Sequence, residues 1–176
     1  MFFRSERLFL RPAWPEDWQT IAQGIGDDAE ARAWVGQAYD SRHPACLIVR
    51  PQQGEVIGGV SLAPHRDGAE LGYWIARRHR GQGYASEATR AMVTMARVIG
   101  HTRLVAHHGL DNPASGRVLT RLGFQPTGAL VDQACALRGR SLPAAAYVLA
   151  LEGVGRSDDD PDGHSDPAGG MMRRAA

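Results

Sequence analysis

The sequence predicts a single α/β domain in which helices flank a mixed β-sheet, and three observations lead to this class. Residues 45–50, 55–62 and 69–76 alternate with a period of two and are joined by short links, which favours an antiparallel meander. A stretch at helical spacing follows and leads into another strand, so the default connection is a right-handed parallel crossover. A chain of 176 residues is long enough to bury a core without a metal or a disulfide.

Before the meander, the chain is predicted to form one strand and two helices. Residues 7–11 alternate as a short strand. The stretch Trp14-Pro15-Glu16-Asp17 is typical of a helix start, because proline and acidic side chains suit the first turn. A second short helix is predicted over residues 28–35.

After the meander, cap and turn residues mark the remaining boundaries. Gly100 follows the first helix where a C-terminal cap belongs, and Asn112 precedes Pro113 as an N-cap for the second. The predicted elements are a helix over 84–99, a strand over 103–108, a helix over 112–122, and strands from 124 onward and over 144–151, around a turn at 138–140.

Composition excludes several classes of function. All 20 basic residues are arginine, and 19 acidic residues leave a formal charge of +1, so neither nucleic acid nor a membrane is predicted as a partner. The absence of lysine excludes the phosphate-binding loop of ordinary nucleotide triphosphatases, which requires one. Cys46 and Cys135 cannot make a four-cysteine zinc site, and no metal is predicted. No apolar run is long enough to span a bilayer or act as a signal peptide, which predicts a cytoplasmic location.

The last residues differ in composition from the rest of the chain. Residues 153–176 are rich in Asp and Gly, and such a segment cannot bury enough apolar surface to offset its ordering entropy. The sequence therefore predicts a folded domain over residues 1–152 and a disordered tail over 153–176.

The most informative stretch is Arg78-His79-Arg80-Gly81-Gln82-Gly83-Tyr84-Ala85, between a predicted strand and a predicted helix. Glycines let several backbone amides face one concavity, and the helix dipole favours an anion at the same place. This predicts a phosphate site, and a plain glycine turn with solvated arginines is the alternative. A dinucleotide-binding turn is excluded, because no acidic residue stands in Arg103-Leu104-Val105-Ala106, where that fold needs one.

Five segments of the chain, in order, resemble the GNAT superfamily of N-acetyltransferases, and within it the branch that acetylates ribosomal protein N-termini. The segments are Glu6–Leu8 with Leu10–Pro12, Ala69–Ile75, Arg78–Ala85 with Glu87-Ala88, Asp111–Ser115 and Leu122–Phe124, and the resemblance covers about residues 5–151. It implies an α/β fold whose mixed central sheet splays between the fourth and fifth strands, with about four flanking helices. It also implies acetyl-coenzyme A (acetyl-CoA) as the donor.

The resemblance assigns residues to the cofactor. The amides of residues 81–85 would hold the pyrophosphate, and the strand edge at residues 75 and 76 would pair with the pantetheine arm. For Asn112, helix capping explains the residue equally well. The residues assigned to the cofactor are Ile75, Ala76, Arg78, Arg80, Gly81, Gln82, Gly83, Tyr84, Ala85 and Asn112.

The resemblance also suggests catalytic residues. Glu70 matches the glutamate of the fourth strand and is the candidate base, acting through water; a solvated or ion-paired carboxylate is the alternative. Many members of the superfamily use a tyrosine as the acid, but this chain has Leu119 there. Ser115 is the candidate substitute, with helix-start hydrogen bonding as the alternative. A backbone N–H near Ile75 is the expected oxyanion donor.

The sequence thus predicts an N-acetyltransferase that moves an acetyl group from acetyl-CoA directly to a primary amine. At pH 7 an α-amine is about 15 % neutral and a lysine amine is only about 0.04 % neutral. A terminal amine therefore depends less on an enzyme base to remove its proton. A protein N-terminal α-amine is the leading acceptor, and a small-molecule amine is the alternative. Asp27, Asp28 and Glu30 are candidates for attracting a cationic acceptor, unless they serve only as helix-start acids. A noncatalytic CoA-binding sensor is the rival class, and a homodimer is expected.

Overall fold

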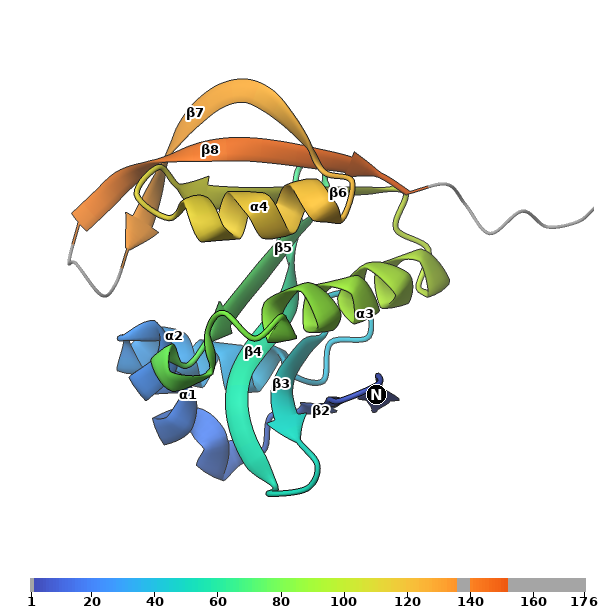
Figure 1. Cartoon of the computed structure of the whole chain (residues 1–176), viewed down its shortest axis with the longest axis vertical. Coiled ribbons are helices and arrows are strands. Elements are labelled where there is room, and N and C mark those ends of the chain that lie inside the picture. Colours follow the sequence, from blue (N-terminus) through green and yellow to red (C-terminus); the bar gives the residue numbers. More distant parts are fainter. Residues whose placement is uncertain (1, 136–139, 152–176) are drawn as a thin grey trace, which may run out of the picture.

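The computed structural model of the chain describes residues 2–135 and 140–151, and it is built around one eight-stranded mixed sheet (Figure 1). The strand order is β1-β2-β3-β4-β5-β6-β8-β7. The strands are β1 (Phe3–Arg4), β2 (Phe9–Pro12), β3 (Ala45–Arg50), β4 (Glu55–His65), β5 (Gly68–Ile75), β6 (Arg103–Gly109), β7 (Gln125–Cys135) and β8 (Arg140–Ala150). Strands β3 to β5 form the antiparallel meander that the sequence predicts, and β6 joins β5 in parallel, also as predicted. Strand β2 extends the antiparallel part of the sheet by pairing with β3.

In the part of the chain that the structure describes, four α-helices flank this sheet, in agreement with the predicted number. They are α1 (Trp18–Ile25), α2 (Asp28–Gln37), α3 (Tyr84–Val98) and α4 (Pro113–Arg121), with short 3-10 turns η1 (Pro15–Asp17) and η2 (Arg77–His79). The stretch predicted to start the first helix forms η1 instead, and α1 begins only at Trp18. The Asp17 carboxylate accepts from the amide of Trp14 and from the guanidinium of Arg11, which fixes this turn before the helix.

Strand alternation divides the core between the two faces of the sheet. On β3, Cys46 and Ile48 pack into the larger cluster with α3 and α4, whereas Leu47 and Val49 pack into a smaller cluster with α1 and α2. In the larger cluster, Met92 of α3, Leu119 of α4 and Phe124 after it are almost completely buried. Helices α3 and α4 are therefore fixed on one face, and α1 and α2 on the other.

The sheet opens between β5 and β6. These two strands pair only at Ala69–Leu104 and Glu70–Val105, whereas β5 pairs with β4 along its whole length. In Figure 1 the two strands run in clearly different directions beyond their contact. They are the fourth and fifth of the strands predicted from the sequence, so the predicted splay is confirmed.

Strand β8 begins at Arg140, earlier than the predicted start at residue 144 and at a position that was predicted to lie in the turn, and it lies between β6 and β7. Most of the turn predicted at residues 138–140, and the tail predicted over 153–176, lie outside the described residues. Among the helices that the structure describes, none has the length and apolar character to cross a membrane.

Candidate active site

A cavity of about 740 Å³ opens where β5 leaves β6. Its wall includes the end of β5, the loop that leads into α3, and the first turns of α4. Trp74 and Gly24 line it from the α1–α2 face, whereas Tyr73 and Ile75 lie on the opposite face of β5. The cavity is therefore lined from both faces of the sheet.

The loop before α3 has the features of an anion site. Gly81 and Gly83 have φ angles of 76° and 81°, a left-handed conformation that suits glycine. Within the described chain, none of the amides of residues 81–86 donates a hydrogen bond to the protein. Four of the five residues from 81 to 85, all except Gln82, line the cavity at the positive end of the α3 dipole. A row of unpaired amides is what a pyrophosphate group needs, so the residues present fit coenzyme A.

A second set of contacts holds this loop from the N-terminal segment. The Glu87 carboxylate of α3 accepts from the Ser5 hydroxyl at 2.7 Å and from the Arg7 guanidinium at 2.8 Å. Burial alone would raise the pKa of Glu87, but the hydrogen bonds from Ser5 and Arg7 outweigh it and lower the pKa. Arg7 also donates to the carbonyl of Gln82 and lies over the Tyr84 ring. The first turn of α3 is thus tied to the segment before β2.

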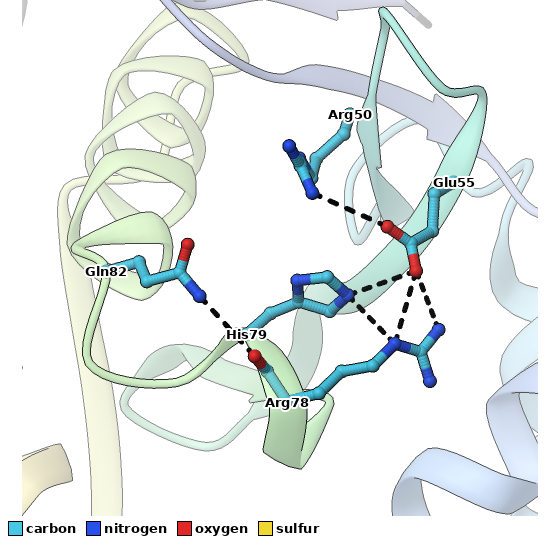
Figure 2. Close-up of polar contacts among 5 residues, drawn as sticks. All are labelled: Arg50, Glu55, Arg78, His79 and Gln82. Atoms are coloured by element: carbon cyan, nitrogen blue, oxygen red, sulfur yellow. Dashed lines mark hydrogen bonds and ion pairs between the residues drawn. The ribbon is translucent and has the colours of Figure 1, made fainter.

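Figure 2 shows how the start of the loop is anchored to the β3–β4 hairpin. Glu55 accepts from Arg78 at 2.7 Å, contacts His79 at 3.1 Å and forms an ion pair with Arg50 at 3.6 Å. Hydrogen bonds from Arg78 and His79 lower the pKa of Glu55. Gln82 donates to the backbone carbonyl of Arg78. Arg78 and Gln82 do not line the cavity, so their side chains support the loop from behind.

The backbone of β5 presents polar groups to the splay. The amide of Ala76 donates to the carbonyl of Ile57, which makes 57 and 76 a hydrogen-bonded pair with β4. Because such pairs alternate along an antiparallel ladder, the N–H groups of Tyr73 and Ile75 point away from β4, toward the opening. Ala76 is engaged with β4 and is not among the lining residues. The carbonyl of Ile75 accepts a hydrogen bond from Nε of Arg80. The N–H of Ile75 is therefore the backbone group of this residue that can bind a ligand.

Helix α4 contributes Asn112 and Ser115 to the cavity wall. The Asn112 side chain caps the helix by accepting from the amide of Ser115 at 3.4 Å. The hydroxyl of Ser115 lies 2.7 Å from the phenol oxygen of Tyr73 on β5. Leu119, which stands where many relatives have a tyrosine, is fully buried in the core. No hydroxyl reaches the cavity from that position of α4.

Glu70 lies outside the cavity wall, near the point where β5 and β6 are still paired. Its carboxylate is 2.8 Å from Nδ1 of His107, which projects from β6 across the apex of the splay. The Glu70 side chain is 32 % exposed and that of His107 is 14 % exposed, so the pair is reachable by water. Any role of Glu70 in proton transfer therefore needs a water molecule.

The structure brings most of the sequence-predicted site residues together. Lining the cavity are Ile75, Arg80, Gly81, Gly83, Tyr84, Ala85, Asn112 and Ser115. Lying outside it are Glu70, Ala76, Arg78 and Gln82. Sequence reasoning missed the contributions of Arg7, Glu55, Tyr73 and His107. For Tyr73 a signal existed, since it alternates with Ile75 on the strand that was expected to face the cofactor.

Comparisons with known proteins place these features in a family. The acetyltransferase (GNAT) domain family matches residues 7–125. The uncharacterized N-acetyltransferase YoaA of Bacillus subtilis is 37 % identical over 148 residues, which are 72 % of this chain and 84 % of that protein. The chain belongs to the GNAT acetyltransferase family. It is thus an N-acetyltransferase that uses acetyl-CoA, as the sequence predicted.

Other similar proteins include enzymes whose names specify ribosomal proteins. The ribosomal-protein-serine acetyltransferase of Escherichia coli is 36 % identical over 83 residues, 45 % of this chain and only 46 % of that enzyme. Among solved structures, the ribosomal L7/L12 α-N-protein acetyltransferase RimL in complex with coenzyme A has a TM-score of 0.69 at 24 % identity, covering 86 % of this chain and 98 % of that one. The ribosomal-protein-S5-alanine acetyltransferase of Vibrio fischeri has a TM-score of 0.69 at 17 % identity, covering 85 % and 96 %. These structures share the fold.

Proposed function

We propose that the protein transfers an acetyl group from acetyl-CoA directly to the N-terminal α-amine of another protein. The observation that carries this proposal is the cavity, which is lined from both faces of β5 at the splay. A donor held on the α3 side and an amine arriving from the α1–α2 side would meet at the gap, so no covalent enzyme intermediate is required.

The donor side is assigned to the loop and to β5. The unpaired amides of residues 81–86 would bind the pyrophosphate of acetyl-CoA. The N–H of Tyr73 would pair with the pantetheine arm, as an added strand does. The N–H of Ile75 would donate to the thioester oxygen, where negative charge develops during attack. The N–H groups of Tyr73 and Ile75 point toward the opening, which supports this assignment.

The acceptor side is assigned to the end of the cavity near α1 and α2. Glu30 lines this end, and burial together with the charge of Asp27 raises the pKa of Glu30. Asp27 itself caps α2, because its side chain accepts from the amide of Glu30 at 2.7 Å. A carboxylate at the entrance attracts an ammonium group, and an α-amine loses its proton near neutral pH far more readily than a lysine does. Glu70 would then accept the proton through water, with His107 orienting its carboxylate.

The similarity to the E. coli enzyme, whose name specifies a ribosomal protein as substrate, supports a protein acceptor. A cytoplasmic location is part of the same proposal, since ribosomal proteins and acetyl-CoA occur there. That the protein forms a homodimer stays a prediction.

The test measures thiol release from acetyl-CoA with a panel of amines. The panel contains peptides with a free N-terminus, the same peptides with a blocked N-terminus and a free lysine, and small amines such as polyamines and amino sugars. Release with the free N-terminus alone supports the proposal, and Glu70→Gln and Ser115→Ala should both reduce it. Faster release with a small amine would contradict the protein acceptor, and tight CoA binding with no release for any amine would favour a sensor.

A further inference from the structure

The phenol of Tyr73 has a defined partner at the cavity. Tyr73 projects from β5 toward α4, and its hydroxyl lies 2.7 Å from Oγ of Ser115 and 3.2 Å from the backbone oxygen of Ser115. Both side chains line the cavity. Among the described residues, these are the hydrogen bonds found for the two hydroxyls, so neither is engaged elsewhere in the protein. The contact joins residues 42 positions apart, across the opening between β5 and α4.

Departure of the thiol requires a proton at this end of the site. A lone serine is a weak source, because donating its proton would leave an alkoxide on the helix. Ser115 is the third residue of α4 and lies within its first turn. The positive end of the helix dipole there stabilises negative charge on a nearby sulfur. A second hydroxyl that replaces the serine proton removes the difficulty. Tyr73 is placed to supply it, since no residue of α4 offers a phenol.

We propose that Tyr73 and Ser115 form a two-hydroxyl relay that protonates the departing thiolate of coenzyme A. This inference rests on the proposed function and extends it by naming a second hydroxyl. When the carbon–sulfur bond breaks, its electron pair goes to sulfur, and the proton of Ser115 Oγ follows it. The phenol proton of Tyr73 moves to Ser115 Oγ in the same step. Water in the cavity returns a proton to the phenolate, balanced by the proton that the acceptor amine releases to water.

Two further observations agree with this arrangement. Burial raises the pKa of Tyr73, although the hydrogen bond with Ser115 offsets part of the rise, so the phenol keeps its proton at neutral pH. The ring packs against the main core cluster, which holds the phenol in position before the donor binds. Tyr73 reaches the sulfur only through Ser115, and it is therefore a positioning residue.

The experiment is a double-mutant cycle with Tyr73→Phe and Ser115→Ala, assayed by thiol release with the amine that the wild type uses. We expect Tyr73→Phe to lower kcat about ten- to a hundredfold, at or below the lower end of the range for general acid catalysis, because Ser115 remains in place. KM for acetyl-CoA and the Kd for coenzyme A should stay within about twofold. In the Ser115→Ala background, Tyr73→Phe should have almost no further effect, because the relay is already broken. Tyr39→Phe is the matched control, since Tyr39 is 67 % exposed and lies away from the cavity, and it should leave kcat unchanged.

Any of four results would overturn the relay. If Tyr73→Phe keeps the wild-type kcat, Tyr73 takes no part in the step. If the losses of the two single variants add up in the double variant, the two hydroxyls act separately. A loss in Tyr73→Phe that appears in KM or in coenzyme A affinity indicates a structural role. If Tyr73→Phe does not fold, the test rests on Ser115→Ala, which leaves β5 intact. The relay is rejected if Ser115→Ala then shows no loss of kcat. No release by the wild type with any amine contradicts the proposed function itself, which separates the two failures.

Discussion

Replacing Asp17 with Asn tests whether a buried ion pair holds the first helices in place. Arg11 donates to Asp17 at 2.6 and 3.0 Å, and both residues are less than 10 % exposed. The substitution leaves the guanidinium of Arg11 buried without an opposite charge, and the loss of one partner of such a pair costs about 3–5 kcal/mol. For a chain of this length, each kcal/mol shifts Tm by about 2–4 °C, so we expect Tm to fall by about 6–20 °C.

The pH dependence of the same variant checks the cause. Burial alone would raise the pKa of Asp17, but hydrogen bonds from Arg11 and the Trp14 amide outweigh it and hold the pKa below its ordinary value. A lowered folded-state pKa stabilises the fold above the unfolded value of about 3.9, and this contribution is lost as the pH falls through the folded-state pKa. Denaturant unfolding of wild type and Asp17→Asn should differ most at pH 7, and the difference should narrow progressively as the pH falls below about 4. Glu16→Gln, at an exposed neighbour, is the control. An equal gap at pH 7 and pH 3 would refute the ion-pair reasoning.

Three further predictions concern the site. Gly83→Ala forces a side chain into the left-handed region at a cost of about 1–2 kcal/mol, so calorimetry should show about tenfold weaker binding of coenzyme A. The control Gly36→Ala in α2 has open space and should bind normally. Glu55→Gln releases the start of the loop and should raise KM for acetyl-CoA several-fold with little change in kcat; an unchanged KM would contradict the anchoring role. His107→Ala should lower kcat about tenfold without changing coenzyme A affinity, because it removes the partner of Glu70, and wild-type kcat would show that the pair is only structural.

Local signals were enough to predict the framework of the site. Glycines at 81 and 83 directly before a periodic helix indicate a turn with free amides, and Asn112-Pro113 indicates a helix start. Both features depend on residues within one turn of each other. The splay could be predicted because the resemblance to the acetyltransferases specifies the whole sheet.

Contacts between distant segments could not be predicted in this way. Arg78 is adjacent to the phosphate loop in sequence, yet Glu55, 23 residues earlier, binds its guanidinium on the far side of the loop. The pairing of Glu70 with His107 depends on how two strands cross at the apex of the splay. The approach of Tyr73 to Ser115 depends on where α4 packs on the core. Each contact is decided by tertiary packing, which a local pattern does not contain.

Hydrogen–deuterium exchange with and without coenzyme A tests the central assignment most directly. The amides of residues 81–86 have no partner in the protein and should exchange quickly in the free enzyme. Saturating coenzyme A should slow their exchange strongly, together with that of Tyr73 and Ile75. Unchanged exchange over 81–86 under saturating ligand would show that the cofactor binds elsewhere, and the assignment of this loop would be wrong.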